Sequence, residues 1–238
     1  MFENVLAIIP ARGGSKAIKN KNLVKLNNKP LVCHSIELAK KSQFINKIIV
    51  STDSDEIKKI SKKFGAEVPF TRPKELATDD ATDYVVFRHC LEWLKENQGY
   101  NSNLVVHLRP TYPLRDPHFV DNAISQAFEN QNFDSMRSVC EPFQNPYKMW
   151  TLEAKQLLPF ISDQNSKEKY NWPRQKLKKI FWQNGCLDII KPQTILRLNS
   201  ISGNKILPII MDSDAIFDVD DLFSLQLVEG HIKYKNDV

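Results

Sequence analysis

Short apolar runs alternate with helical apolar stripes over the first half of the chain. The run Val5 to Ile9 is unbroken, as expected of a parallel strand covered on both faces, and Pro10 ends it. Similar runs predict further strands at 47–51, 66–70 and 104–108. Apolar positions at helical spacing between these runs predict helices at about 31–39, 54–64, 82–97 and 117–128. This order predicts a Rossmann-like three-layer α/β/α fold around a twisted, mostly parallel sheet.

Local signals mark the ends of two of these helices. Ser54 can cap the second helix, and Gly65 is a typical stop signal at its end. Asp116 followed by Pro117 forms a cap and a first turn for the helix that runs to Phe128.

The alternation stops between about Glu141 and Lys179. Prolines interrupt this segment at 142, 146, 159 and 173, and the extended pieces at 148–152 and 156–161 are typical of a protruding β-hairpin. Its large apolar residues either fold back on the main core or meet a second copy of the chain, and we favour a homodimer. These residues are Phe143, Tyr147, Met149, Trp150 and Phe160.

Regular elements return after this segment. Apolar runs predict strands at 186–190 and 206–210, and an apolar stripe predicts a helix from 220 to about 235. We therefore expect one domain over residues 1–238, with a dimerisation arm inserted at about 141–179.

Composition narrows the class of partner. Of the 238 residues, 42% are hydrophobic and 26% are charged, which argues against a disordered chain and fits one large α/β domain. The 33 basic and 28 acidic residues give a net charge of +5 that is spread along the sequence. A mild and distributed excess favours an anionic small molecule over a nucleic acid.

The cysteines and the length of the apolar runs indicate the compartment. Cys33, Cys90, Cys140 and Cys186 are widely spaced and form no C-x-x-C pair, so we expect reduced core thiols. No apolar run is long enough to span a bilayer, and the N-terminus lacks a signal-peptide core. A cytoplasmic protein without a membrane partner is the expectation.

The first strand leads directly into a glycine pair surrounded by cations. Gly13 and Gly14 allow backbone N–H groups to converge on an anion. The cations of this loop are Arg12, Lys16, Lys19 and Lys21. The segment matches neither the P-loop nor the dinucleotide-binding pattern. It is therefore either a phosphate-binding loop of another type or a tight turn with solvated lysines.

Other candidate groups fall near strand ends. Arg109 and Thr111 follow the strand at 104–108, at the edge where open sheets bind ligands, although an arginine there can also be an ordinary loop residue. Asp218 and Asp220 flank Val219, so an extended backbone points both carboxylates the same way, as in a Mg²⁺ site. Further acidic residues nearby weaken that signal. The remaining candidates favour structural roles. Asp53, Asp79, Asp80 and Asp83 are more often helix caps than catalytic groups, and the histidines at 34, 89, 107, 118 and 231 fit packing or surface positions.

Seven short segments carry a more specific signal because they occur together and in a fixed order. They are Pro10–Lys16 with Lys21–Asn22, Val50–Asp53, Arg72–Ala77 with Asp79 and Ala81, Arg109–Arg115, Pro173–Gln175, Asn184–Gly185 and Asp218–Asp220. Together they resemble the acylneuraminate cytidylyltransferases, the CMP-sialic acid synthetases, over nearly the whole chain. The related CMP-Kdo synthetases resemble it less, because their first loop reads differently.

This resemblance implies a nucleotide-diphospho-sugar transferase-like fold and a nucleotidyl transfer. CMP would pass from CTP to the anomeric hydroxyl of a nine-carbon α-keto acid sugar, N-acetylneuraminate or a close relative, and pyrophosphate would leave. Legionaminate or another bacterial nonulosonate is the alternative acceptor, and Kdo is less favoured. The implied cofactor is Mg²⁺, for which Mn²⁺ can substitute, and the implied assembly is a homodimer. A nucleotide-binding sensor without turnover is the alternative outside enzymes.

The resemblance also assigns roles by position. The nucleotide would be bound by Ala11, Arg12, Gly13, Gly14, Ser15, Lys16, Lys21, Asn22, Arg72, Ala81 and Asp83. The sugar would be bound by Arg109, Thr111, Arg174 and Asn184, together with Lys148 of the partner subunit. Arg109 would pair with the sugar carboxylate as a fork. The catalytic group would be Arg12, Lys21, Asp218 and Asp220, the two aspartates also being the metal ligands. No general base is identified in the sequence. Activation of the attacking hydroxyl by the metal, or one of the two aspartates, would fill that role.

Three departures from the family pattern bear on the choice of substrate. Ala17 and the segment Ile18–Asn20 stand where a glycine and a proline are usual. An additional arginine before Pro173 has no clear counterpart, with Lys167 or Lys169 the nearest cations. Asp83 stands where some members have serine.

Overall fold

The computed structural model describes residues 3–162, 168–212 and 217–237, and the chain forms two compact units. The main unit comprises residues 1–138, 185–209 and 217–238, and the arm unit comprises residues 139–184 and 210–216. The arm expected at 141–179 falls within the second of these ranges. Lys167, considered above as a substitute cation, lies outside the described residues.

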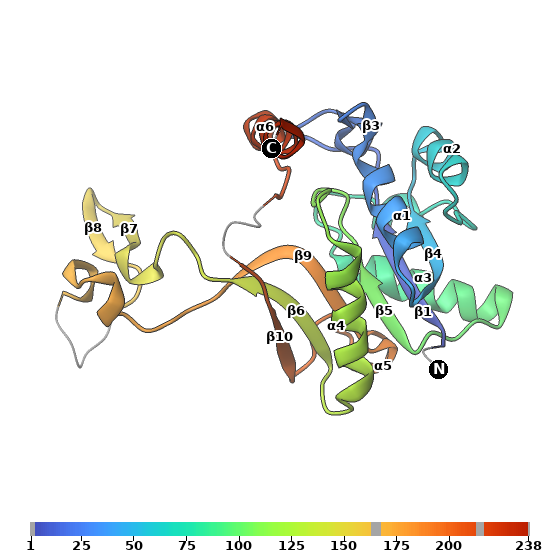
Figure 1. Ribbon diagram of the computed structural model, residues 1–238. Coiled ribbons are helices and arrows are strands. Elements are labelled where there is room, and N and C mark those ends of the chain that lie inside the picture. Colours follow the sequence, from blue (N-terminus) through green and yellow to red (C-terminus); the bar gives the residue numbers. More distant parts are fainter. Residues whose placement is uncertain (1–2, 163–167, 213–216, 238) are drawn as a thin grey trace. The chain divides into compact units, whose positions relative to one another are not determined.

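A six-stranded sheet forms the centre of the fold, in the order β10-β6-β9-β5-β1-β4 (Figure 1). Strand β1 (Val5–Pro10) pairs in parallel with β4 (Ile45–Ser51) and with β5 (Leu104–His107). Strand β9 (Trp182–Ile190) runs antiparallel to β5, with His107 opposite Asp188. The sheet is completed by β6 (Ser135–Cys140) and β10 (Ile206–Ile210). The predicted α/β sheet is confirmed, and β9 makes it a mixed one.

Helices cover both faces of this sheet. Helix α3 (Asp83–Gln98) packs on Leu6 and Ile8 of β1. Because side chains alternate along a strand, the neighbouring residues of β1 point to the opposite face of the sheet. On that opposite face, α1 (Leu31–Lys41) contacts β1, β4 and α4 (Pro117–Glu129) (Figure 1). The remaining helices are α2 (Asp55–Lys63), α5 (Pro192–Leu196) and α6 (Leu222–Asp237). Among the described residues, no helix has both the length and the apolar character needed to cross a membrane.

The predicted helix caps and core thiols are confirmed. Ser54 accepts a hydrogen bond from the backbone N–H of Ile57, and Asp116 accepts one from that of His118. All four cysteines are buried, and none of them is in a disulfide. Short 3-10 turns occur at Lys21–Leu23, Lys74–Leu76, Pro146–Lys148, Lys169–Asn171 and Arg174–Lys176.

Two small hairpins turn without glycine. In the main unit, β2 (Lys25–Leu26) and β3 (Lys29–Pro30) are joined by Asn27 and Asn28, both with positive φ. In the arm unit, β7 (Trp150–Glu153) and β8 (Gln156–Pro159) are joined by Ala154 and Lys155, with φ of 46° and 68°. Two consecutive positive φ angles are the signature of a type I′ turn, which matches the twist of the flanking strands.

The structure corrects the sequence prediction at two strands. The strand predicted at 66–70 is wrong: only Glu67 forms an isolated parallel bridge, to Ile49, and Pro69 has no N–H to extend the ladder. Strand β6 was missed because serines and an arginine break its apolar run. These serines are nevertheless buried and bonded, as Ser138 Oγ accepts from the backbone N–H of Leu187 at 2.8 Å.

Gly203 and Gly99 offer a matched test of packing in the main unit, because both have positive φ. A Cβ on Gly203 would lie 2.3 Å from Cβ of Asp134, which is held by the backbone N–H groups of Asn204 and Lys205, whereas a Cβ on Gly99 meets nothing within 4 Å. In urea unfolding, we expect Gly99→Ala to cost about 1 kcal/mol from backbone strain alone. Gly203→Ala should cost at least about 2 kcal/mol more, because the clash adds overpacking. Equal losses would contradict this.

Candidate active site

The loops that follow β1 and β5 open onto a pocket of about 410 Å³ in the main unit. This is the edge at which the carboxyl ends of parallel strands leave the sheet, the usual ligand site of open α/β folds. Many residues proposed from the sequence line it. The lining is Pro10, Arg12, Ser15, Lys16, Ala17, Lys21, Asn22, Arg72, Thr78, Asp79, Ala81, Asp83, Val86, Arg109, Pro110 and Thr111.

The glycine loop is anchored to the neighbouring strand end. The backbone N–H of Gly13 donates to Oδ1 of Asp53 at 2.9 Å, and a Cβ on Gly13 would lie 3.1 Å from Cβ of Ser54. Asn22 closes the loop from the other side, because its Nδ2 donates to the carbonyl of Arg12 at 2.8 Å. A side chain at position 13 would therefore crowd Ser54.

The cations of the loop already hold a carboxylate of the protein. Arg12 Nη2 lies 2.6 Å from Oδ1 of Asp79, and Lys16 pairs with the other oxygen of the same carboxylate. The hydrogen bonds from Lys16 and Arg12 lower the pKa of Asp79 below its ordinary value, so it carries its charge at neutral pH. Asp79 thus occupies two cations that could bind a phosphate group.

The second half of the loop, where the chain departs from the family pattern, is held by an apolar contact. Ile18 is buried in a cluster with Val219 and Leu225, which brings the C-terminal segment against the loop. Asn20 adopts the left-handed conformation that turns the chain into the 3-10 turn at Lys21. Lys21 Nζ then lies 3.1 Å from Oδ1 of Asp220.

Asp218 and Asp220 present a partly unsatisfied pair of carboxylates. Val219 between them is fully buried and its backbone N–H donates to the carbonyl of Thr111 at 2.7 Å. Burial raises the pKa of Asp218, and the charge of Asp220 adds to this effect. A hydrogen bond with the Thr111 side chain acts in the opposite direction. The buried Oδ1 of Asp218 accepts no hydrogen bond from the described residues.

This arrangement fits a divalent cation. Mg²⁺ is usually bound by one or two carboxylates, with substrate phosphates and water completing its shell. The described parts of the chain contain no group of three or more acidic, histidine or cysteine residues that could hold a metal alone. Asp218 and Asp220 would therefore share the ion with the substrate.

Arg72 lines the pocket and is hydrogen-bonded to the end of β4. It is buried, and its guanidinium donates to the hydroxyl of Ser51 at 3.0 Å and to the carbonyl of the same residue. Burial lowers the pKa of Arg72 to about 10, against the opposing charges of Asp53 and Asp83. Its charge is thus largely committed to the end of β4.

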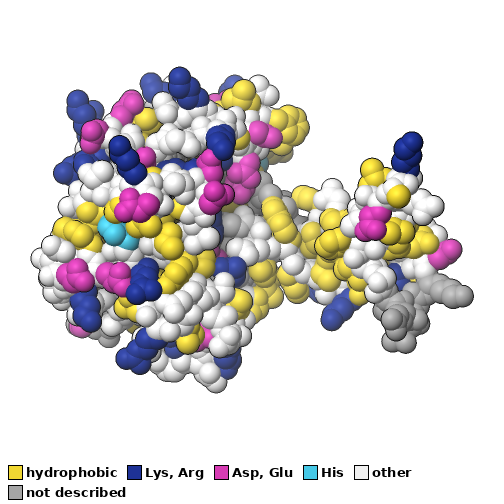
Figure 2. Space-filling model, turned by 180° about the vertical axis from the view of Figure 1, so that it is seen from behind, with side chains coloured by type: hydrophobic (Ala, Val, Ile, Leu, Met, Phe, Trp, Pro, Cys, Tyr) yellow, Lys and Arg dark blue, Asp and Glu magenta, His cyan; other side chains and the backbone are white. Residues whose placement is uncertain are grey.

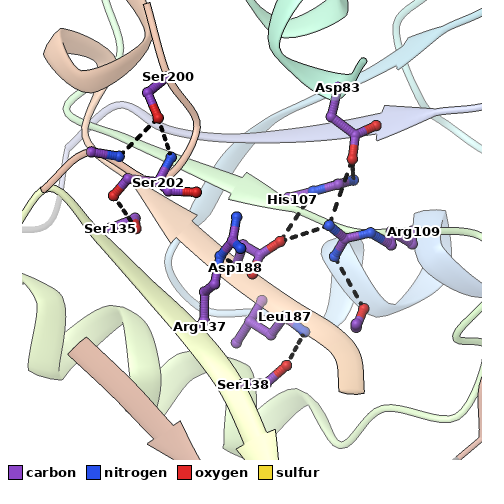
Figure 3. Close-up of polar contacts among 12 residues, drawn as sticks. Asp83, His107, Arg109, Ser135, Arg137, Ser138, Leu187, Asp188, Ser200 and Ser202 are labelled. Atoms are coloured by element: carbon purple, nitrogen blue, oxygen red, sulfur yellow. Dashed lines mark hydrogen bonds and ion pairs between the residues drawn. The ribbon is translucent and has the colours of Figure 1, made fainter. Parts of the chain in front are cut away.

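Arg109 lies on the pocket wall but is paired on its inner side (Figure 3). Its Nη2 lies 2.8 Å from Oδ2 of Asp188 and 3.6 Å from Oδ2 of Asp83, and its Nη1 donates to the carbonyl of Gly185. No motif or spacing in the sequence points to Asp188, because only the pairing of β5 with β9 brings it here. His107, considered a packing residue, is also part of this cluster.

Three residues proposed to bind the sugar belong to the arm unit. Lys148 Nζ donates to the carbonyl of Tyr170 at 3.1 Å, and Arg174 Nη2 donates to that of Pro142 at 2.7 Å. Asn184 is buried and donates to the sulfur of Met211. Their role in binding a sugar remains a prediction.

The pairing of Asp79 with the loop cations predicts competition with phosphate. We expect Asp79→Asn to tighten the binding of inorganic triphosphate by about two- to fivefold, the range for an exposed ion pair that is lost. Isothermal titration calorimetry at low salt would measure it. Asp80→Asn removes the same charge one residue along and should change the affinity less. Weaker binding in Asp79→Asn, or an equal gain in both variants, would contradict the competition.

The chain is similar to known proteins over most of its length. Residues 6–178 match the family described as Cytidylyltransferase. The chain is 34% identical to post-translational flagellin modification protein B of Campylobacter coli, over 99% of this chain and 97% of that protein. It is 32% identical to CMP-N,N'-diacetyllegionaminic acid synthase of Campylobacter jejuni, over 98% and 96%.

Other matches cover less of the partner or show the fold alone. The chain is 31% identical to N-acylneuraminate cytidylyltransferase of Escherichia coli O18:K1:H7, but it spans only about half (52%) of that protein's length. The solved structure of CMP:2-keto-3-deoxy-manno-octonic acid synthetase complexed with CTP superposes with a TM-score of 0.72 at 14% identity, covering 98% of this chain and all of that one. The predicted nucleotidyltransferase fold is confirmed. The chain belongs to the cytidylyltransferase family.

Proposed function

We propose that the protein transfers CMP from CTP to the anomeric hydroxyl of a nonulosonic acid and releases pyrophosphate. The observation that carries this proposal is a contact between opposite charges beside the pocket: Nζ of Lys21, which lines the pocket, lies 3.1 Å from Oδ1 of Asp220 in the carboxylate pair. The cations proposed to bind phosphate and the carboxylates proposed to bind the metal are thereby adjacent. The names of relatives that act on sialic, legionaminic and pseudaminic acids support the substrate class.

The proposed reaction needs strong neutralisation of charge. The anomeric oxygen forms a bond to the α-phosphorus, and the bond from that phosphorus to the oxygen bridging to the β-phosphate breaks. The hydroxyl proton is lost to water or to a carboxylate, and pyrophosphate leaves. Two anionic substrates meet and an anionic leaving group forms, so preorganised positive charge is the main requirement.

The residues of the glycine loop would supply this charge. Arg12 and Lys16 would exchange Asp79 for the phosphates of CTP, and Lys21 would stay close to the leaving group. Asn22, Arg72 and Ala81, which line the same pocket, would hold the cytidine. Asp218 and Asp220 would hold Mg²⁺, or Mn²⁺ in its place, which when bound polarises the phosphoryl oxygens and neutralises their charge.

The acceptor is proposed as a class. N-acetylneuraminate and the legionaminates share an α-keto acid end and differ in their substituents. The Campylobacter relatives named for flagellin modification and legionaminate match over nearly their full length, whereas the named sialic acid enzyme of Escherichia coli is matched over half. Both acceptors therefore belong in the first assay, with pseudaminate and Kdo beside them.

Pyrophosphate release with each nucleoside triphosphate, with and without Mg²⁺, tests the proposal. We expect release only with CTP, Mg²⁺ and a nonulosonic acid. Asp218→Asn and Asp220→Asn should each lower turnover at least about 100-fold, because they remove ligands of the ion that stabilises the phosphoryl charge. CTP binding should survive in part.

Asp221→Asn is the matched control for these two variants. Asp221 is the next carboxylate along and accepts from the backbone N–H of Ser224 at 2.7 Å. Its loss should leave turnover within a few-fold. Binding of CTP without release for any acid would favour the nucleotide sensor, and near wild-type turnover in both Asp218→Asn and Asp220→Asn would remove them from the site.

We also propose that the arm unit mediates a homodimer. Hydrophobic side chains gather over its surface (Figure 2). Leu152 and Leu157 are opposite each other in the hairpin and are 72% and 62% exposed. Exposed apolar surface of this extent on a short hairpin is typical of an interface.

A charge placed on the hairpin tests the dimer. Sedimentation equilibrium should give twice the chain mass of 27.5 kDa for the unmodified protein and the monomer mass for Leu157→Glu. Leu198→Glu, at an exposed leucine of the main unit, is the control and should remain dimeric. A monomeric unmodified protein would refute the proposal.

A further inference from the structure

Five ionisable side chains form a cluster behind the pocket (Figure 3). They come from four parts of the main unit: Asp83 begins α3, His107 and Arg109 lie at and after the end of β5, Arg137 lies in β6 and Asp188 in β9. Asp83 and Arg109 line the pocket, whereas Asp188 does not. The cluster therefore links the pocket wall to the interior of the sheet.

Asp188 is the centre of this cluster because β9 lies between β5 and β6. His107 Nδ1 lies 3.4 Å from Oδ2 of Asp188 on one side, and Arg137 Nε lies 3.4 Å from its Oδ1 on the other. Arg109 Nη2 makes the shortest contact, 2.8 Å. Each oxygen of Asp188 thus faces a guanidinium group.

The carboxylate of Asp188 is ionised although only 1% of its side chain is exposed. Burial alone would raise its pKa, but the His107 ring and the charges of Arg109 and Arg137 lower it below the ordinary value. Burial and the charge of Arg109 lower the pKa of His107, so the imidazole is neutral. The positive charges of the Arg109 and Arg137 guanidinium groups then equal the negative charges of the Asp83 and Asp188 carboxylates, so the cluster has no net charge.

Arg109 is the cation of this cluster that lines the pocket. Its side chain is 20% exposed and faces the pocket, while Asp188, Asp83 and the Gly185 carbonyl hold the other side of its guanidinium. A long side chain held at three points has lost its rotamer freedom before a ligand arrives. Its charge is also compensated before a ligand arrives.

We propose that Asp188 is a positioning residue for Arg109. It fixes the guanidinium at the pocket wall and balances its charge, so that Arg109 donates hydrogen bonds to hydroxyl or amide oxygens of the acceptor sugar. Arg109 is then not the cation that captures the sugar carboxylate, which revises the role expected from the sequence. This inference deepens the proposed function and rests on it.

The two roles of Arg109 predict opposite effects of Asp188→Asn. If Asp188 positions Arg109, its loss releases the guanidinium, and KM for the acceptor should rise about tenfold while KM for CTP changes less than twofold. If Arg109 captured a carboxylate, removal of the competing charge of Asp188 would lower KM for the acceptor. A lower or unchanged value would overturn the proposal.

A double-mutant cycle separates positioning from a general loss of structure. If Asp188 acts through Arg109, Asp188→Asn should add nothing to the rise in acceptor KM produced by Arg109→Gln. Additive effects would overturn the proposal. Ser138→Ala is the matched control, because it removes the hydrogen bond from the backbone N–H of Leu187, the residue beside Asp188, and leaves all five side chains of the cluster unsubstituted. It should leave the acceptor KM unchanged.

A measurement without substrate tests the clamp itself. In ¹⁵N NMR of arginine side chains, the Arg109 signals, identified by their absence in Arg109→Gln, should show restricted rotation in the unmodified protein and in Ser138→Ala. Asp188→Asn should lose this restriction. Free rotation of Arg109 in the unmodified protein would overturn the proposal even if Asp188→Asn fails to fold. Absence of pyrophosphate release with every acid would instead refute the proposed function and leave the NMR result to decide the clamp.

Discussion

One backbone hydrogen bond assembles the site, from the N–H of Val219 to the carbonyl of Thr111 at 2.7 Å. It attaches a C-terminal segment to the loop after β5, and burial of Val219 against Ile18 draws the same segment to the glycine loop. Val219 is buried between Asp218 and Asp220, and the two carboxylates are close enough for the charge of Asp220 to contribute to the raised pKa of Asp218. The carboxylate pair and the glycine loop are therefore brought to one edge of the sheet by an apolar contact.

Most cations around the pocket already have a carboxylate partner within the protein. Asp79 pairs with Arg12 and Lys16, Asp220 with Lys21, and Asp188 with Arg109. The net charge of +5 therefore says little about the field at the site. An anionic ligand gains affinity there by exchange of partners, which favours ligands with several phosphate oxygens over a single charge.

Local signals in the sequence were sufficient for most of the helices and strands and for the position of the glycine loop. Ser54 and Asp116 cap helices through bonds to residues two or three positions away, so their roles are written in adjacent sequence. Strand β6 could not be predicted, because its buried serines are stabilised by hydrogen bonds to residues distant in the sequence, such as Leu187. Asp188 could not be predicted either. It meets His107 only because of the register between β5 and β9, and the two residues are 81 positions apart in the sequence. Residues that belong to a short sequence motif could be proposed as site residues. Buried residues that contact them from a distant strand could not.

The turn of the arm hairpin has a thermodynamic consequence. Alanine and lysine rarely adopt positive φ in a free chain, so the residues at 154 and 155 disfavour the hairpin until its strands are covered. The leucines of that hairpin remain largely exposed within the arm unit. Where a second chain covers them, association supplies the free energy that the turn opposes. Protein concentration then enters the stability of the hairpin, and dilution would loosen it before the sheet of the main unit is affected.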